Sequence, residues 1–214
     1  MPSLPILYSL RQCPYAMRAR MGLLLAKQQV ILREVIMKNK PTEMITASAK
    51  ATVPILVINQ SLVIDQSLDI MLWALNKNDP NNLLHGGQVA MLELIYRTDN
   101  EFVDSLKKYK AASRYHDVEK DSYRSHCETY INFLEQRLSQ HEYLMGDIPC
   151  LADYAILPFI RQFSRVERQW YRQAPYPRLQ RWLTAQYQQP IFAQAMVKYE
   201  PWRKADAPVL FGNI

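Results

Sequence analysis

The chain is organised around the segment LYSLRQCPYAMR, residues 7–18. The mostly apolar residues 6–10 predict a short buried strand, and the apolar spacing from Pro14 onward predicts a helix with a wide apolar face. The polar turn between them places Cys13 at the start of that helix. Pro14 suits the first helical position, because its missing N–H costs nothing there and its fixed φ is already helical.

Cys13 is the candidate nucleophile. The unpaired backbone N–H groups of a helix start carry a partial positive charge, so they stabilise a thiolate relative to a thiol. Arg11, Arg18 and Arg20 add positive charge nearby, although the helix phase turns some of them away. Ala16 replaces the second cysteine of a Cys-x-x-Cys motif, so a disulfide at Cys13 needs a second molecule or a distant residue. The alternative is a small buried cysteine that fills a strand–helix corner.

Composition limits the class of protein. With 214 residues, 49% hydrophobic and 21% charged, the chain can form one large or two small globular domains. No segment approaches the roughly 18 consecutive apolar residues of a membrane span, and the N-terminus lacks a secretory signal. We expect a cytoplasmic protein with no membrane partner. The net charge of +6 is spread along the chain, so no nucleic-acid partner is expected and a small anionic ligand would suit it.

The cysteines and histidines give no sign of a metal site. Three cysteines, Cys13, Cys127 and Cys150, and four histidines show no metal-ligand spacing. We therefore expect no metal, and a reducing compartment would keep the three cysteines as thiols.

Residues 30–37 predict a second strand. Because a helix connects it to the first strand, the two strands should be parallel. Residues 55–58 and 62–64 predict two more strands. Proline cannot donate to a strand ladder, so Pro54 marks an edge or a special turn, and a cis Val53–Pro54 bond is an option. The main chain of Val53 would then be free to pair with an extended peptide. A trans proline that merely opens a strand is the alternative.

A third helix begins after Asp65, with Gln66 and Ser67 at its start. Helix starts bind carboxylates, and the Ser67 hydroxyl can add to the backbone donors. Simple helix capping is the alternative interpretation.

Together these motifs resemble a glutathione transferase of the cysteine type, most similar to the omega-like branch. The family has a Cys-Pro-Tyr at the first helix, a Lys-Pro after the second strand, a cis Val-Pro and a Glu/Gln-Ser pair that opens the third helix. In this sequence these are, in the same order, Cys13-Pro14-Tyr15, Lys40-Pro41, Val53-Pro54 and Gln66-Ser67.

The resemblance implies a role for each of these positions, with glutathione as co-substrate. Cys13 would face the glutathione sulfur, and Lys40 would meet the glycine carboxylate. Val53, beside Pro54, would pair with the cysteinyl backbone, and Gln66 and Ser67 would hold the γ-glutamyl end. Charge complementarity agrees, because glutathione offers a carboxylate at each end to a lysine and to a helix start.

Three features depart from the family pattern. The least of them is Gln66, which replaces the acidic member of the Glu-Ser pair, as it does in other branches of the family. Relatives often have proline and glycine before Val53, where this chain has Ala49 and Ala51, so a positive φ there would be strained. Cys150 stands at the helix cap where the family has Ser or Thr, and Asp153 would return the hydrogen bond as a structural residue.

The second half predicts helices over residues 89–112, 117–140, 151–168, 176–188 and 191–199. The expected fold is α/β plus all-α: a thioredoxin-like glutathione-binding domain over residues 1–77, a linker over about 78–85 and an all-helical domain over 86–214. The aromatic candidates for a second-substrate pocket are Tyr109, Tyr115, Phe163, Trp170 and Tyr171, with core or dimer packing as the alternative for each. Arg114, Arg161 and Arg165 could attract an anionic substrate or lie on a solvated surface.

Three functions follow as hypotheses. The first is a glutathione-dependent thiol transferase, acting on a glutathionylated substrate or a small electrophile through a mixed disulfide at Cys13. The second is conjugation of glutathione to electrophiles, with Tyr8 or Ser9 as hydrogen-bond donor to the glutathione thiolate. The third is a non-catalytic interaction module. The resemblance also implies a homodimer.

Overall fold

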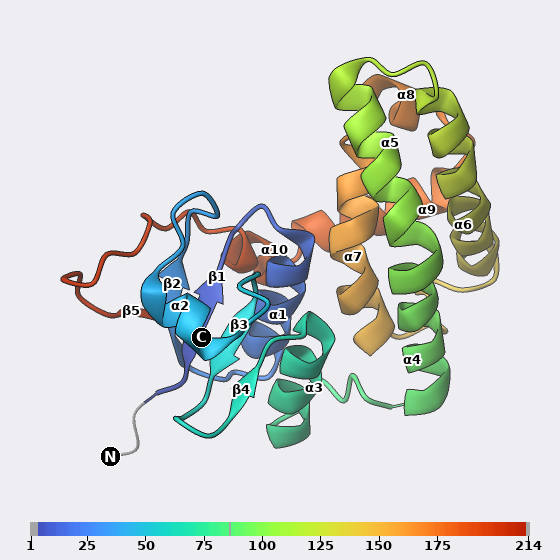
Figure 1. Cartoon of the computed structure of the whole chain (residues 1–214). Helices are drawn as coiled ribbons and strands as arrows, with labels where there is room; N and C mark the ends of the chain where they lie inside the picture. Colours follow the sequence, from blue (N-terminus) through green and yellow to red (C-terminus); the bar gives the residue numbers. More distant parts are fainter. Residues whose placement is uncertain (1–3, 86, 213–214) are drawn as a thin grey trace. The chain divides into compact units, whose positions relative to one another are not determined.

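The computed structural model describes residues 4–85 and 87–212 (Figure 1). One compact unit comprises Met1–Asn81 together with Gln189–Ile214, and the other comprises Asn82–Gln188. The boundary at Asn81 falls inside the expected linker. The segment from Gln189 onward groups with the first unit, so the helical domain expected over 86–214 is too long at its C-terminal end.

The first unit is a mixed sheet with helices. Its strands are β1 (Ile6–Ser9), β2 (Val30–Glu34), β3 (Ile55–Val57), β4 (Val63–Ile64) and β5 (Val209–Phe211), in the order β4-β3-β1-β2-β5. Strands β1 and β2 are parallel, which confirms the predicted strand–helix–strand unit, and the other neighbours pair antiparallel. Its helices are α1 (Pro14–Leu25), α2 (Thr42–Ala47), α3 (Ser67–Lys77) and α10 (Pro190–Ala195).

Helices α1 and α2 lie on opposite faces of the sheet. Neighbouring residues of a strand point to opposite faces, and Ser9 of β1 contacts Arg20 of α1 while Tyr8 belongs to a core cluster with Met44 of α2. Helix α3 packs closely on α1, because a Cβ added at Gly22 would lie 2.7 Å from the Met71 Cα.

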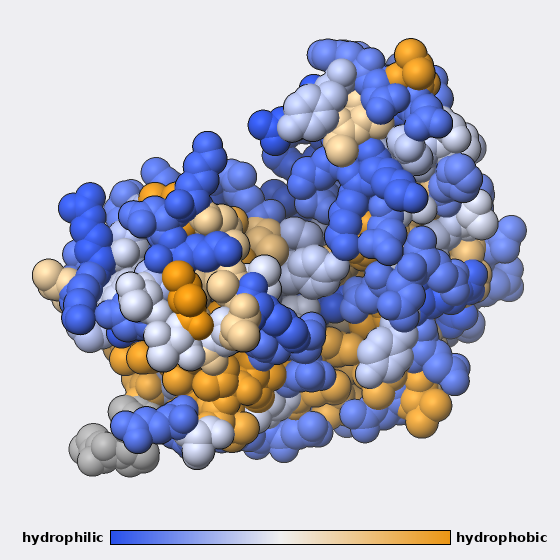
Figure 2. Space-filling model, viewed as in Figure 1, coloured by the Kyte–Doolittle hydropathy of each residue, from blue (hydrophilic) through white to orange (hydrophobic). Residues whose placement is uncertain are grey.

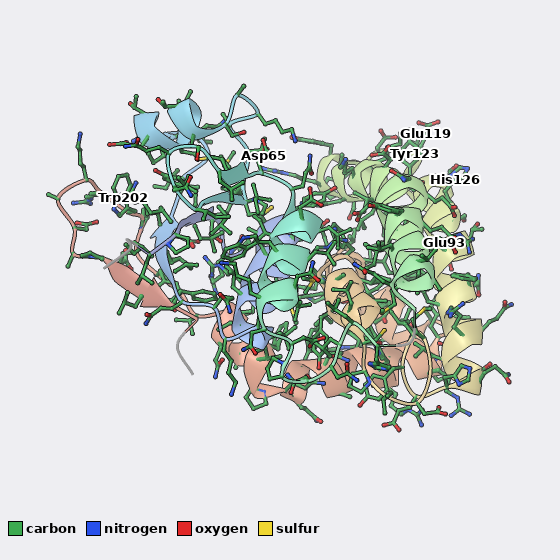
Figure 3. All side chains as sticks on the ribbon, turned by 90° about the horizontal axis from the view of Figure 1, so that it is seen from below. Asp65, Glu93, Glu119, Tyr123, His126 and Trp202 are labelled. Atoms are coloured by element: carbon green, nitrogen blue, oxygen red, sulfur yellow. The ribbon has the colours of Figure 1, made fainter. Side chains whose placement is uncertain are left out.

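Strand β5 was not predicted. After α10 the chain returns along β2, where Leu32 and Val209 are paired residues, and we call residues 197–211 the C-terminal strap. Trp202 of the strap donates its backbone N–H to the Glu34 carbonyl at 2.8 Å (Figure 3). The Arg33 guanidinium lies over the Trp202 ring at 4.0 Å from its centroid, a cation–π contact.

The second unit is helical. It contains α4 (Gln88–Arg97), the π-helical turn η1 (Thr98–Phe102), α5 (Val103–Tyr115), α6 (Lys120–Gln140), α7 (Leu151–Ser164), α8 (Arg168–Gln173) and α9 (Pro177–Gln188). The helix predicted over 89–112 thus includes a π-helical turn, where the buried Thr98 hydroxyl donates to the Leu94 carbonyl at 3.0 Å and lies 2.6 Å from the Tyr130 hydroxyl. The helix predicted over 151–168 ends at Ser164.

Asp153 has the structural role that the sequence predicts. Its carboxylate is fully buried and accepts hydrogen bonds from the Leu144 N–H, the Cys150 N–H and the Trp182 indole N–H, each at 3.0 Å. Cys150 closes the capping box of α7 by accepting from the backbone of the third helical residue. One carboxylate therefore joins α7, α9 and the loop before α7.

The surface carries some apolar residues. In the view of Figure 2, hydrophobic residues gather on the first unit around β3 and β4. Leu62, just before β4, is 45% exposed. Within residues 4–85 and 87–212, no helix combines the length and the apolar character that crossing a membrane requires.

Candidate functional site

Cys13 lies at the start of α1. It is the N-cap residue, Pro14 follows as the first helical residue, and no acidic side chain lies in the first turn. The backbone holds it firmly, because the Cys13 N–H donates to the Leu10 carbonyl and the Met17 N–H donates to the Cys13 carbonyl, both at 2.9 Å. The partly exposed Cys13 thiol makes no capping hydrogen bond and donates instead to the Val53 carbonyl at 3.8 Å.

The Val53–Pro54 peptide bond is cis, which confirms that option of the sequence analysis. Both residues are buried, and the Val53 carbonyl is aimed at Cys13. In the loop before Val53, Ala51 has the positive φ that the sequence analysis considered, with a value of 45°. That left-handed conformation costs an alanine roughly 1–2 kcal/mol, so the loop is held by contacts elsewhere.

One such contact is made by Asp65, just before α3 (Figure 3). Its carboxylate accepts hydrogen bonds from the Ser48 hydroxyl at 2.6 Å and from the Lys50 ammonium at 2.9 Å. The Ser48 hydrogen bond is the main cause that lowers the pKa of Asp65, and Lys50 adds to it. These bonds tie the loop before Val53 to the start of α3.

The start of α3 lies in the same unit as Cys13. Gln66 is its exposed N-cap residue, and Ser67 is the first helical residue and is only 5% exposed. The buried Arg18 of α1 donates to the Ser67 hydroxyl at 3.5 Å. Arg18 was noted in the sequence only as nearby charge, and its contact with Ser67 was missed because the pair is 49 positions apart.

Lys40 lies on the α2 side of the sheet. It is partly buried and lines a cavity of about 1000 Å³ together with Tyr8, Arg33 and Trp202 of the strap. Lys204 of the strap reaches Glu43 of α2 at 3.6 Å. The strap therefore forms part of the surroundings of Lys40, which no sequence motif indicated.

Arg20 and Glu34 form a buried ion pair behind the site. Arg20 also donates to the Ser9 hydroxyl at 2.8 Å and to the Ala195 carbonyl at 3.2 Å. The second oxygen of Glu34 accepts from the Arg11 N–H at 2.7 Å. This pair joins α1, β2, α10 and the loop before Cys13. The only sequence signal was an arginine within an apolar helix and a glutamate in the next strand.

The hydroxyls of Tyr8 and Ser9 are both engaged. Tyr8 is 2% exposed and its hydroxyl accepts a hydrogen bond from Arg33 at 2.6 Å. Burial is the main cause that raises the pKa of Tyr8. Ser9 is fully buried and accepts from Arg20. Each hydroxyl thus serves an internal contact.

The aromatic candidates for a second-substrate pocket lie in the helical unit. Tyr109 and Phe163 are 0% and 1% exposed, with ring centroids 5.8 Å apart, and Trp170 packs edge-on against Phe163 at 5.9 Å. The Tyr109 hydroxyl donates to Glu167 at 2.7 Å. This packing corrects the expectation for Tyr109 and Phe163, because both are core residues and neither has surface to offer a substrate.

No group of three or more His, Cys, Asp or Glu side chains within residues 4–85 and 87–212 is placed to hold a metal ion.

The three thiols are expected to differ strongly in reactivity. Burial raises the pKa of Cys127 and of Cys150 to about 12, and these residues are 0% and 2% exposed. Because the thiolate is the reactive form, iodoacetamide at pH 7.5 should label Cys13 and leave the other two unmodified. Peptide mass spectrometry of the native protein measures this. Equal labelling of Cys127 in the folded protein would contradict it, and labelling of all three in urea is the control.

Comparison with known proteins identifies the family. The glutathione S-transferase N-terminal domain model matches residues 7–82, and the C-terminal domain model of the same family matches residues 117–185. Mouse glutathione S-transferase omega-1 is 24% identical over 204 residues, which cover 92% of this chain and 82% of the mouse protein.

Solved structures agree in fold. One is a glutathione transferase family member from Pseudomonas fluorescens with two glutathione bound. It has a TM-score of 0.80 at 15% identity, and the match covers 92% of this chain and 93% of the Pseudomonas chain. Glutathione S-transferase-I bound with lactoylglutathione has a TM-score of 0.75 at 20% identity, with coverage of 91% and 99%. The two family models follow one another in order and together match more than half of the sequence, so the chain belongs to the glutathione S-transferase family of enzymes.

Proposed function

We propose that the protein is a glutathione-dependent thiol transferase of the omega-like type, with Cys13 as its nucleophile. The observation that carries the proposal is the position of the Cys13 sulfur at the start of α1, 3.8 Å from the Val53 carbonyl. A sulfur so placed meets the dipole of a helix whose first turn has no competing acidic group. The resemblance to omega-1, by name a glutathione S-transferase, supports the same assignment.

The proposed reaction has two thiol–disulfide exchanges. The Cys13 thiolate attacks the glutathione sulfur of a glutathionylated substrate, a bond forms between these two sulfurs, and the substrate leaves as its thiolate. A second glutathione thiolate then attacks the same glutathione sulfur, which gives oxidised glutathione and returns the Cys13 thiolate. In total, the substrate disulfide and one free glutathione become the substrate thiol and oxidised glutathione; one disulfide is broken and one is formed, so bonds and electrons balance.

The site offers glutathione complementary groups. The Val53 carbonyl, next to cis Pro54, is aimed at Cys13 and suits the cysteinyl N–H of the tripeptide, which would replace the Cys13 thiol as its donor. Gln66 and Ser67 at the start of α3 suit the γ-glutamyl carboxylate. Lys40 suits the glycine carboxylate at the opposite end.

Arg18 extends this assignment by one residue. It is 1% exposed and donates to the Ser67 hydroxyl, so it fixes the orientation of that hydroxyl. Its charge, close to the start of α3, adds to the attraction for a carboxylate. We therefore include Arg18 as a positioning residue for the γ-glutamyl end.

Conjugation of glutathione receives less support from the site. It needs a hydroxyl that can reach the glutathione thiolate, and the two candidates, Tyr8 and Ser9, are only 2% and 0% exposed. The interaction-module hypothesis is weakened by membership of an enzyme family.

Two assays on the wild-type protein separate these functions. With glutathione present, reduction of hydroxyethyl disulfide is expected to exceed conjugation of chlorodinitrobenzene, measured as turnover per site. Mass spectrometry after oxidised glutathione is added should find glutathione on the Cys13 peptide. Fast conjugation without detectable disulfide reduction would reject thiol transfer. Absence of glutathione binding in calorimetry would restore the interaction-module hypothesis.

We also propose a cytoplasmic homodimer that acts on a small electrophile or a glutathionylated substrate. Support for self-association comes from exposed apolar residues: Leu62 beside β4, and Val89 and Tyr96 on α4, are 45%, 71% and 51% exposed. Such residues favour burial against a partner. Analytical ultracentrifugation that finds a monomer at micromolar concentration would reject the dimer.

A further inference from the structure

A cavity of about 370 Å³ lies within the helical unit, where the end of α7 meets α8 and α9. Arg165 follows α7, and Arg168 and Arg172 lie four positions apart on α8, so these two share a helix face. The remaining lining residues that the structure describes are uncharged: Ser164, Tyr171, Gln180, Leu183, Thr184 and Tyr187. The cavity thus combines three positive charges with neutral walls.

Two other arginines of the same unit are paired with carboxylates. Arg97 pairs with Glu101 at 2.8 Å and Arg124 with Glu167 at 2.9 Å. Over residues 4–85 and 87–212, by contrast, no carboxylate lies within ion-pair distance of Arg165, Arg168 or Arg172. The positive charge of the cavity is therefore not neutralised from within the described chain.

Glu135 is the acidic group whose charge acts on Tyr171, and it is already in use. Its two carboxylate oxygens accept the Arg178 N–H at 3.0 Å and the Leu179 N–H at 2.8 Å. It therefore serves the first turn of α9 and does not line the cavity.

A buried hydroxyl supplies an independent sign of a ligand. Tyr171 lines the cavity and is 6% exposed, and its hydroxyl has no hydrogen-bond partner among the described residues. A buried polar group without a partner is costly, so such groups are rare in folded proteins. Burial raises the pKa of the neighbouring Tyr187, while the charges of Arg161, Arg165 and Arg168 act to lower it.

We propose that this cavity binds the phosphate group of a small molecule. Guanidinium groups present rigid forks of N–H donors that match phosphate oxygens, and three of them suit a group with about two negative charges better than a single carboxylate. An oxygen of the ligand would also give the Tyr171 hydroxyl its acceptor. The volume falls in the usual range for small-molecule sites, so a phosphate and a ring or short chain fit together.

Calorimetry on the full chain tests this with inorganic phosphate, phenyl phosphate and benzoate at constant ionic strength. We expect saturable binding of inorganic phosphate or phenyl phosphate that is tighter than the binding of benzoate. Tighter binding of inorganic phosphate would identify free phosphate as the natural type of ligand, and tighter binding of phenyl phosphate would identify a phosphate ester. Arg168→Gln should weaken that binding about tenfold or more, because a charge-assisted hydrogen bond is lost. Tyr171→Phe should weaken it several-fold without lowering the thermal unfolding midpoint.

The matched control is Arg114→Gln, an exposed arginine of the same unit that lies outside the cavity. It should change the affinity less than twofold. The proposal fails if neither phosphate binds saturably at about 10 mM, if benzoate binds as tightly, or if the Arg168→Gln and Arg114→Gln variants lose affinity equally. A variant counts only if its unfolding midpoint stays within a few degrees of wild type.

Discussion

Cys13→Ser is expected to lower the rate of thiol transfer by on the order of a thousandfold or more, because a hydroxyl cannot form the mixed disulfide. The oxygen fits the space of the sulfur and can still donate to the Val53 carbonyl, so the fold and the affinity for glutathione should remain near wild type. Hydroxyethyl-disulfide reduction measures the rate, and calorimetry with glutathione measures the binding.

Two matched variants complete this experiment. Cys127→Ala and Cys150→Ser remove the other thiols, which are buried in the helical unit, and both should keep thiol-transfer activity per folded molecule. In Cys13→Ser the rate of chlorodinitrobenzene conjugation should fall much less than the rate of thiol transfer, since conjugation needs only a hydrogen-bond donor. Full thiol-transfer activity in Cys13→Ser, or its loss in Cys127→Ala, would remove Cys13 from the mechanism.

Asp153→Ala is expected to lower the free energy of unfolding by about 4 kcal/mol. The change leaves the Leu144, Cys150 and Trp182 N–H groups buried without their acceptor, and hydrogen bonds to a charged group contribute roughly 1.5–3 kcal/mol each. Since many domains have only 5–15 kcal/mol in total, the loss is a large fraction of the stability. Urea unfolding followed by circular dichroism measures it.

A graded set of variants makes this result interpretable. Asp153→Asn keeps the shape and one acceptor oxygen, so its loss should be smaller than that of the alanine variant. Asp147→Ala removes an aspartate whose side chain is 79% exposed and which lies 3.5 Å from His141, and a change below about 1 kcal/mol is expected. Similar losses in Asp153→Ala and Asp147→Ala would show that the buried carboxylate is not a structural centre.

The arrangement around Cys13 could be predicted where the signal is local. A cysteine before a proline, at the junction of an apolar strand and an apolar helix, indicates a helix start within a few residues of sequence. The same holds for the cis option at Val53–Pro54 and for Asp153, three positions after the cap of α7. In each case the residues that create the geometry are neighbours in the chain.

Prediction failed where a contact joins distant segments. Arg18 and Arg20 were expected only as positive charge near Cys13, because nothing near them in sequence reveals that Ser67 and Glu34 meet them in the interior. Tyr109 and Phe163 could have lined a pocket or filled a core, and only the packing of α5 against α7 decides between these. Strand β5 is three residues long, and its pairing depends on the free edge of β2 more than on its own sequence.

The path of the C-terminal strap has a consequence for how the protein is made. Domains that are continuous in sequence can fold as soon as they leave the ribosome, N-terminal first. Here Arg20 finds its Ala195 acceptor, and β2 its outer neighbour, only in segments that follow the helical unit in the chain. The unit that carries Cys13 therefore reaches its final form only after the helical unit has been synthesised.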